Sequence, residues 1–361
     1  MDLISLGSLF SRESSPLLGI DISSTSLKLV ELHRGRDGVL VLQHCASEPL
    51  ERGWVNEGNV EKFDEVAEAM RRLVKKSGAA TKNVAMALPG SAVITKKVNF
   101  PAGLSEDELE IQVESEASQY IPFPLEEVSL DFCVIGASPN MPDNVEVLLA
   151  ASRKEKVLDR QGLAEAAGLN PVVLDVESYA SRLAASRVIE TLPNRGKNML
   201  IALFELGSQT SSLQVIRNDE MIYERDQSFG GAQLTNMIAR HYGMSFEDAE
   251  SKKRSGGVPA DYAESVLGPF MEGVGQDIGR ALQFFFTSTP HNKVDHVLIS
   301  GGAAATPGLD VAVMNHTSFP CKVVNPFDGM VVGAKVSADL VRKEGTSFLV
   351  ATGLAMRRFT E

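Results

Sequence analysis

Cysteine, tryptophan and positive charge are scarce in this chain of 361 residues. Its three cysteines, Cys45, Cys133 and Cys321, form no CxxC motif and no zinc-type Cys/His spacing. A disulfide framework and a zinc site are therefore not expected, and a reducing cytoplasm is the simplest environment. The net charge is −12 and no basic stripe is present, which argues against nucleic-acid binding.

Long apolar runs are also missing. No stretch reaches the roughly 20 apolar residues of a transmembrane helix, and no signal peptide is recognisable. Residues 1–16 carry almost no positive charge, so a flexible tail is expected there rather than a membrane anchor. An apolar fraction of 43% and a charged fraction of 23% are those of a globular protein, long enough for two or more lobes.

The chain instead repeats one pattern, in which an apolar strand reaches an acidic residue, turns through small polar residues and leaves as a second strand. The first copy, residues 19–32, centres on Asp21, and the second, residues 200–216, centres on Glu205. Such hairpins aim backbone N–H groups and hydroxyls at phosphates, while the carboxylate faces a metal. Each hairpin alone is better explained as an ordinary polar turn.

A third element strengthens the pattern. The strand His296–Ser300 ends in Gly301 and Gly302, where the absence of a Cβ lets a ligand approach the backbone. Two acidic hairpins followed by such a strand resemble the actin, Hsp70 and sugar-kinase superfamily, in which the hairpins are phosphate loops and the glycines belong to the adenosine loop. The resemblance implies an α/β fold with two lobes of RNase H-like subdomains, and ATP and Mg²⁺ as ligands.

Residues 84–169 depart from the actin pattern and are typical of a compact α+β unit. Within it, Ser105 and Glu108 form the signature of a capping box, which predicts an acidic helix that ends near Tyr120. We expect this inserted unit to be an interaction surface, with a packing role as the alternative. Further along, Phe284–Phe286 are expected to be core residues of a long helix.

Several sequence blocks narrow the resemblance; they span residues 18–28, 119–125, 229–235, 300–302 and 353–357. They are similar to the PilM family, the actin-like proteins of type IV pilus assembly, and the similarity runs from about Leu17 to Phe359. It implies an FtsA-like arrangement, in which an extra subdomain replaces the second small subdomain of actin. The implied parts are a flexible tail (1–16), a 1A-like core of the first lobe (17–83, 170–195 and 336–361), an inserted 1C-like α+β subdomain (84–169), a 2A-like core of the second lobe (196–235 and 294–335) and a 2B-like helical insert (236–293).

The resemblance also implies a set of nucleotide-binding residues, namely Asp21, Ser23, Ser24, Ser26, Lys28, Glu205, Gly207, Ser208, Gly230, Gly231, Glu250, Lys253, Gly301, Gly302 and Ala303. Of these, Asp21 and Glu205 would face Mg²⁺, directly or through water, although the family more usually has Asp where Glu205 stands. Glu177 resembles the acid that orients the attacking water, and as an acid in a first helical turn it is also favoured by the helix dipole. Without the family fold, Glu250 and Lys253 are better explained as a solvated helix face. Slow or no ATP hydrolysis is expected.

The implied function is an ATP-binding protein that binds the short N-terminal cytoplasmic tail of a PilN-type inner-membrane protein. It would link the cytosolic machinery to the alignment complex, in the cytoplasm and peripherally attached to the inner membrane through its partner. Pilus assembly ATPases and the platform protein are further candidate partners. We expect Ile121, Phe123 and Leu125 of the inserted unit to line the peptide groove, although burial of at least one of them is also expected.

Two alternatives remain from the sequence. A small-molecule kinase of the same superfamily needs a carboxylate base beside an acceptor hydroxyl, and no spare Asp in a Gly/Thr-rich turn lies between the hairpins. An FtsA-like filament-forming division protein is expected to carry an amphipathic basic tail after its last helix, and the sequence ends at Glu361 without one.

Overall fold

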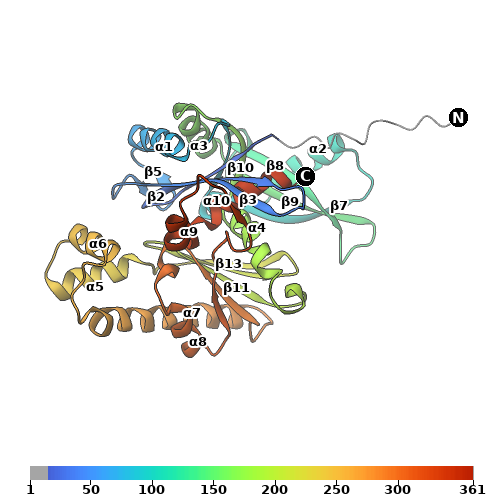
Figure 1. The fold of residues 1–361 in the computed structure, drawn as a ribbon. Helices are drawn as coiled ribbons and strands as arrows, with labels where there is room; N and C mark the ends of the chain where they lie inside the picture. The colour runs from blue at the N-terminus through green and yellow to red at the C-terminus, as the bar shows by residue number, and fades with distance from the viewer. Residues whose placement is uncertain (1–14, 361) are drawn as a thin grey trace.

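The computed structural model describes residues 15–360, so most of the tail expected at 1–16 lies outside the described residues. Figure 1 shows two lobes stacked on one another, each built around one large β-sheet. A separate three-stranded sheet stands beside the first lobe. No helix within residues 15–360 has the length and apolarity needed to cross a bilayer.

The first lobe is built on a six-stranded sheet in the order β10-β6-β1-β2-β3-β16. Its strands are β1 (Leu18–Ile22), β2 (Ser26–Arg34), β3 (Leu40–Pro49), β6 (Asn83–Leu88), β10 (Asn170–Val176) and β16 (Val331–Val332). Helices α1 (Phe63–Ser77) and α3 (Lys154–Ala166) pack on one face, and α4 (Glu177–Ile189) and α10 (Leu349–Met356) pack on the other. Because both faces are covered, every residue of β1 is buried, which explains its nearly continuous apolar sequence.

The second lobe is built on a five-stranded sheet in the order β13-β12-β11-β14-β15. Its strands are β11 (Ile201–Leu206), β12 (Ser211–Arg217), β13 (Glu220–Gln227), β14 (His296–Ser300) and β15 (Cys321–Val323). Its helices are α5 (Ala232–Tyr242), α6 (Phe246–Ser255), α7 (Gly268–Ser288) and α8 (Leu309–Thr317), with α9 (Ala338–Glu344) leading back to the first lobe. Helix α4 also packs against this sheet, so it lies between the lobes (Figure 1).

The prediction that Phe284–Phe286 are core residues is wrong for Phe284. Phe285 is fully buried in the core of the second lobe, but Phe284 is 51% exposed and lies under the guanidinium of Arg225, 4.3 Å from its ring centroid. Successive side chains on a helix point in directions about 100° apart, so consecutive residues cannot all face one sheet.

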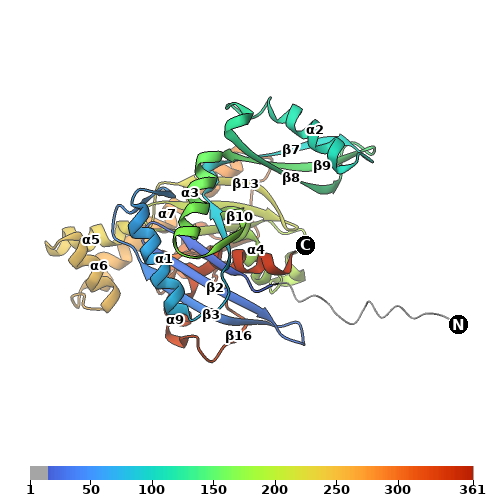
Figure 2. The same ribbon diagram turned by 90° about the horizontal axis from the view of Figure 1, so that it is seen from above.

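The inserted unit contains a sheet in the order β7-β9-β8, formed by β7 (Val93–Pro101), β8 (Val128–Ala137) and β9 (Asn144–Arg153). Helix α2 (Glu106–Ala117) packs on it and begins with the predicted capping box, in which Ser105 and Glu108 bond to each other's backbone. The predicted bounds 84–169 are too wide, because β6 pairs within the first sheet and α3 packs on that sheet. Figure 2 shows that the inserted unit proper, formed by β7, α2, β8 and β9, stands apart from the first sheet.

Several short elements complete the fold. A two-stranded hairpin of β4 (Val55–Asn56) and β5 (Asn59–Val60) precedes α1. Single helical turns are η2 (Gly90–Ala92), η3 (Leu125–Glu127), η4 (Pro193–Gly196), η5 (Ala263–Leu267), η6 (Gly302–Ala305), η7 (Gly345–Phe348) and η8 (Arg357–Phe359).

Candidate functional site

The turn between β1 and β2 holds an ion pair. The antiparallel register places Lys28 opposite Asp21, and Lys28 Nζ lies 3.1 Å from Asp21 Oδ2. Lys28 Nζ also donates to Ser23 Oγ at 3.0 Å, and Ser23 Oγ donates to the carbonyl of Ser26 at 2.8 Å. Both charged side chains are buried, so each needs the other. Ser24 lies at the tip of this turn, which is therefore ordered by the residues predicted to face phosphate.

The acid of the second hairpin is Glu205 on β11. Its Oε2 accepts a hydrogen bond from Ser181 Oγ on α4 at 2.6 Å. Burial raises the pKa of Glu205 to about 7; the hydrogen bond from Ser181 and the charge of Lys28 oppose this, while the charge of Asp21 adds to it. Charged residues of the first hairpin, Asp21 and Lys28, therefore influence the pKa of Glu205 on the second hairpin.

Glu177 is the first residue of α4 and directly follows β10. Burial, together with the negative charges of Asp21 and Glu205, raises its pKa to about 8, and the positive charge of Arg160 opposes this shift. The charges of Asp21 and Glu205 both act on Glu177, so the three carboxyl groups lie near one another. We call these three residues the acidic cluster.

The loop before α5 is tied to the second turn. The carbonyl groups of Gly207 and Ser208 accept hydrogen bonds from the backbone N–H groups of Gly231, at 2.9 Å, and Ala232, at 2.8 Å. A Cβ on Gly230 would lie 2.5 Å from the carbonyl oxygen of Ser208, so only glycine fits there. The predicted loop residues of the second lobe therefore form one connected backbone segment.

The two glycines after β14 have different roles. Gly301 has φ of +92°, and a Cβ there would lie 2.4 Å from the carbonyl oxygen of Leu206. A Cβ on Gly302 would have nothing within 4 Å. Ala303 follows in η6 and lies next to Gly231, where an added Cβ would be 3.2 Å from that of Ala303. Gly301 is therefore needed by the fold, whereas Gly302 borders open space.

Glu250 and Lys253 form an ion pair on α6, with Nζ 2.6 Å from Oε2. Thr235 on α5 donates to Glu250 at 2.6 Å and accepts from Lys253 at 2.7 Å. Burial would raise the pKa of Glu250, but hydrogen bonds from Lys253, Thr235 and Arg254 lower it to about 2. These hydrogen bonds hold α5 and α6 together. Thr235 is not among the nucleotide-binding residues predicted from the sequence.

Ile121 is not available to line a groove in the inserted unit. It is buried in a core cluster with Ala117 and Val128, because it closes the end of α2 against the sheet. Phe123 and Leu125 are only partly buried against that cluster. The guanidinium of Arg153 lies 4.0 Å from the ring centroid of Phe123.

Arg160, on α3, is a buried residue that is not among those predicted from the sequence. It is 4% exposed, its Nη2 donates to the carbonyl of Gly58 at 2.9 Å, and its Nη1 has no hydrogen-bond partner among the described residues. Burial lowers its pKa, and the charges of Glu177 and Asp21 oppose this shift. A signal was present, because Arg160 occupies the apolar face of its helix between Val157 and Ala164.

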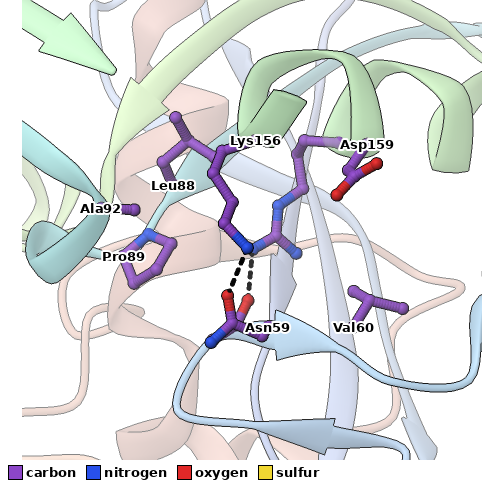
Figure 3. Close-up of a pocket in the computed structure, with 9 residues that line it drawn as sticks. Asn59, Val60, Leu88, Pro89, Ala92, Lys156 and Asp159 are labelled. Atoms are coloured by element: carbon purple, nitrogen blue, oxygen red, sulfur yellow. Dashed lines mark hydrogen bonds between the residues drawn. The ribbon is translucent and has the colours of Figure 1, made fainter. Parts of the chain in front are cut away.

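Arg160 borders a small pocket shown in Figure 3. Its volume is about 20 Å³, roughly enough for one water molecule. Leu88 and Pro89 line one side, and α3 lines the other with Lys156, which donates to Asn59 Oδ1 at 2.9 Å.

The carboxylates alone do not make a metal site, since residues 15–360 contain no group of three or more His, Cys, Asp or Glu that could hold a metal. Mg²⁺ is commonly held by one or two carboxylates together with phosphate oxygens and water. Asp21 and Glu205 could supply the two carboxylates of such a site, with phosphate oxygens and water as the other ligands.

Comparisons with known proteins agree with the predicted fold. The sequence matches the family described as type IV pilus assembly protein PilM over residues 19–359. A solved PilM-PilN type IV pilus biogenesis complex has a chain 28% identical, with a TM-score of 0.77, covering 96% of this chain and 100% of that one. The ethanolamine utilization protein EutJ from Carboxydothermus hydrogenoformans is 16% identical, with a TM-score of 0.56 and coverages of 95% and 89%. MreB 5 of Spiroplasma citri bound to AMPPNP is 12% identical, with a TM-score of 0.50 and coverages of 94% and 95%. The predicted actin-like ATPase fold is confirmed.

Proposed function

The chain belongs to the PilM family of type IV pilus assembly proteins, and we propose that it acts there as an ATP-binding adaptor for an inner-membrane partner. In this proposal Mg-ATP binds between the lobes, and the inserted unit docks on the cytoplasmic tail of a PilN-type protein. The protein would then work in the cytoplasm, held at the inner membrane by that partner.

The convergence of the acidic cluster carries the nucleotide part of the proposal. Asp21 comes from the first sheet, Glu205 from the second, and Glu177 from the helix between them. The backbone of Gly302 is open to a ligand, because an added Cβ there would have nothing within 4 Å, and the adenosine would lie beside it on the second lobe. The solved MreB 5 structure holds AMPPNP, so the fold itself accommodates an ATP analogue.

The other predicted contacts fit this site. Ser23, Ser24, Ser26 and Lys28 would face the phosphates from the first turn, and Gly207 and Ser208 would face them from the second. The hydrogen-bonded group of Thr235, Glu250 and Lys253, which joins α5 to α6, would border the adenosine. Asp21 and Glu205 would hold Mg²⁺ together with phosphate oxygens.

The partner part of the proposal is supported by the solved PilM-PilN complex, in which a chain of 28% identity is found with PilN. In this chain α2 offers acidic side chains, with Glu106, Asp107 and Glu108 in its first turn. They would attract a basic tail and speed its encounter more than they tighten its binding. Phe123 and Leu125 would be the apolar anchors, because both are only partly buried.

A peptide titration tests the partner. A fluorescent peptide with the N-terminal tail of the cognate PilN-type protein is titrated against the whole chain, and binding is followed by anisotropy. Phe123→Ala should weaken binding about tenfold, the loss typical of a removed apolar anchor.

Phe284→Ala is the matched control, because that ring also lies beneath an arginine, at 4.3 Å against 4.0 Å for Phe123. It lies on the second lobe and should bind the peptide like the unmodified chain. Equal affinities for all three proteins would remove Phe123 from the binding surface, and no binding by any of them would defeat the partner proposal.

A further inference from the structure

Arg160 combines burial with an unfulfilled hydrogen-bonding group. Only 4% of it is exposed, and its Nη2 is used by the carbonyl of Gly58. Its Nη1 has no hydrogen-bond partner within residues 15–360. A buried guanidinium donor without a partner is costly, so a ligand, an ion or a water is expected to complete it.

Strand register places this group beside the acidic cluster. Val176, the last residue of β10, pairs with Leu88 at the end of β6. Leu88, which Figure 3 labels, lines the same pocket as Arg160. Glu177 directly follows Val176 in the sequence. Strand β1 is parallel to β6 and carries Asp21 toward the same end of the sheet. The guanidinium therefore lies where the ends of these strands meet.

Charge balance at this place favours a phosphate ligand. The phosphates of a nucleotide are anionic, and they need cationic donors in a site whose other side chains include the carboxyl groups of Asp21, Glu177 and Glu205. Lys28 already pairs with Asp21 and Ser23. Arg160 has a donor to spare, and the planar guanidinium suits phosphate oxygens.

We propose that Arg160 Nη1 binds the terminal phosphate of ATP, so that this chain distinguishes ATP from ADP. This inference rests on the proposed nucleotide site. It also links that site to the inserted unit, since α3 begins at Lys154, directly after β9 ends at Arg153. A contact between Arg160 and the phosphate would thus act on the helix that leads out of the inserted sheet.

Titration calorimetry with Mg-AMPPNP and Mg-ADP tests the inference without turnover. The unmodified chain should bind AMPPNP more tightly than ADP. Arg160→Gln should lower the affinity for AMPPNP about tenfold or more, as expected for a lost charged hydrogen bond, and leave ADP unchanged. Arg160→Lys keeps the positive charge but loses the planar guanidinium, so its affinity for AMPPNP should lie between those of the unmodified chain and Arg160→Gln.

Lys156→Gln is the matched control. Lys156 lies one turn earlier on α3 and bonds to Asn59, next to Gly58, so it tests the tether to the β4–β5 turn alone. It should leave both affinities unchanged.

Equal losses for AMPPNP and ADP in Arg160→Gln, or the same loss in Lys156→Gln, would overturn the inference and leave the nucleotide site standing. An unchanged affinity for both ligands would mean that Nη1 serves only a trapped water, with the same consequence. If the unmodified chain binds neither nucleotide, the proposed function fails together with the inference. Thermal unfolding checks that each variant is folded, and if Arg160→Gln is not, the AMPPNP to ADP ratio of Arg160→Lys decides.

Discussion

Ser181 Oγ donates a hydrogen bond of 2.6 Å to Glu205 Oε2, so a helix packed on the first sheet contacts a strand of the second. The helix, α4, belongs to both cores: Ala180 packs in the first lobe, and Ala184 and Val188 pack against the second sheet. A change in the angle between the lobes would therefore act on this bond and on the carboxyl group of Glu205.

Ser181→Ala should raise the pKa of Glu205 above its value of about 7, because the hydrogen bond that stabilises the carboxylate is lost. If Glu205 helps to hold Mg²⁺, the affinity for Mg-ATP falls as pH drops through this pKa, and the midpoint moves to higher pH in the variant. Calorimetry between about pH 6 and pH 8.5 measures the shift. Ser186→Ala is the control, since the hydroxyl of Ser186 donates to the carbonyl of Leu183 within the same helix. A pH profile that is identical in both variants would contradict the prediction.

Glu177→Gln should stabilise the ligand-free protein at high pH. The pKa of Glu177 is raised from 4.5 to about 8, so between these values the folded state holds more protons than the unfolded state. Stability therefore decreases as pH rises through this window, and the neutral Gln removes that loss. The expected Tm is unchanged near pH 5 and higher by on the order of 2 °C near pH 8.5.

Glu190→Gln provides the control for this measurement. Glu190 lies directly after the C-terminal end of α4, and its side chain is 60% exposed. Its replacement should therefore change Tm little, and by the same amount at both pH values. A Glu177→Gln variant whose Tm difference does not depend on pH would show that the carboxyl group is not destabilised by burial.

The sequence was informative where local chemistry decides the structure. Alternation of apolar and polar residues predicted both hairpins, and their register alone places Lys28 opposite Asp21. Ser105 and Glu108 predicted the start of α2 because a capping box depends on residues three positions apart. The acidic cluster followed from the likeness to actin-like proteins rather than from any local pattern.

Features that depend on contacts distant in sequence escaped prediction. Strand β6 and helix α3 flank the inserted sheet in sequence, but they pack on the first lobe, so the expected boundaries were too wide. Ser181 reaches Glu205 only because α4 lies between the lobes. Arg160 lies on the apolar face of its helix, but its burial comes from tertiary packing, which the sequence does not show.

The two adjacent glycines after β14 should respond oppositely to replacement. Gly302→Leu fills open space and should weaken Mg-ATP binding at least about tenfold through a clash with the adenosine, with Tm nearly unchanged. Gly301→Ala combines a positive φ with a contact of 2.4 Å to the carbonyl of Leu206, so it should lower Tm by several degrees. Calorimetry and thermal unfolding of both variants measure the difference. A Gly302→Leu variant that is folded and binds normally would place the adenosine elsewhere.

Hydrolysis of ATP should be slow near neutral pH. A residue that accepts a proton from attacking water must be ionised, and burial together with the charge of Asp21 raises the pKa of Glu177 to about 8. In most molecules the carboxyl group of Glu177 is then protonated near pH 7. We therefore expect a turnover number below about 1 per second.

The raised pKa of Glu177 also sets the direction in which turnover changes with pH. Turnover by the unmodified chain should increase as pH rises from about 7 to about 9, because Glu177 loses its proton over this range. Phosphate release measured under saturating Mg-ATP gives the profile, and Glu177→Gln should abolish the increase, since an amide cannot act as a base. Glu190→Gln, at the exposed far end of the same helix, should retain it. A turnover of 1 per second or faster near pH 7 that is lost in Glu177→Gln would show that Glu177 is already ionised in the nucleotide complex, and a profile shared by all three proteins would remove it from the reaction.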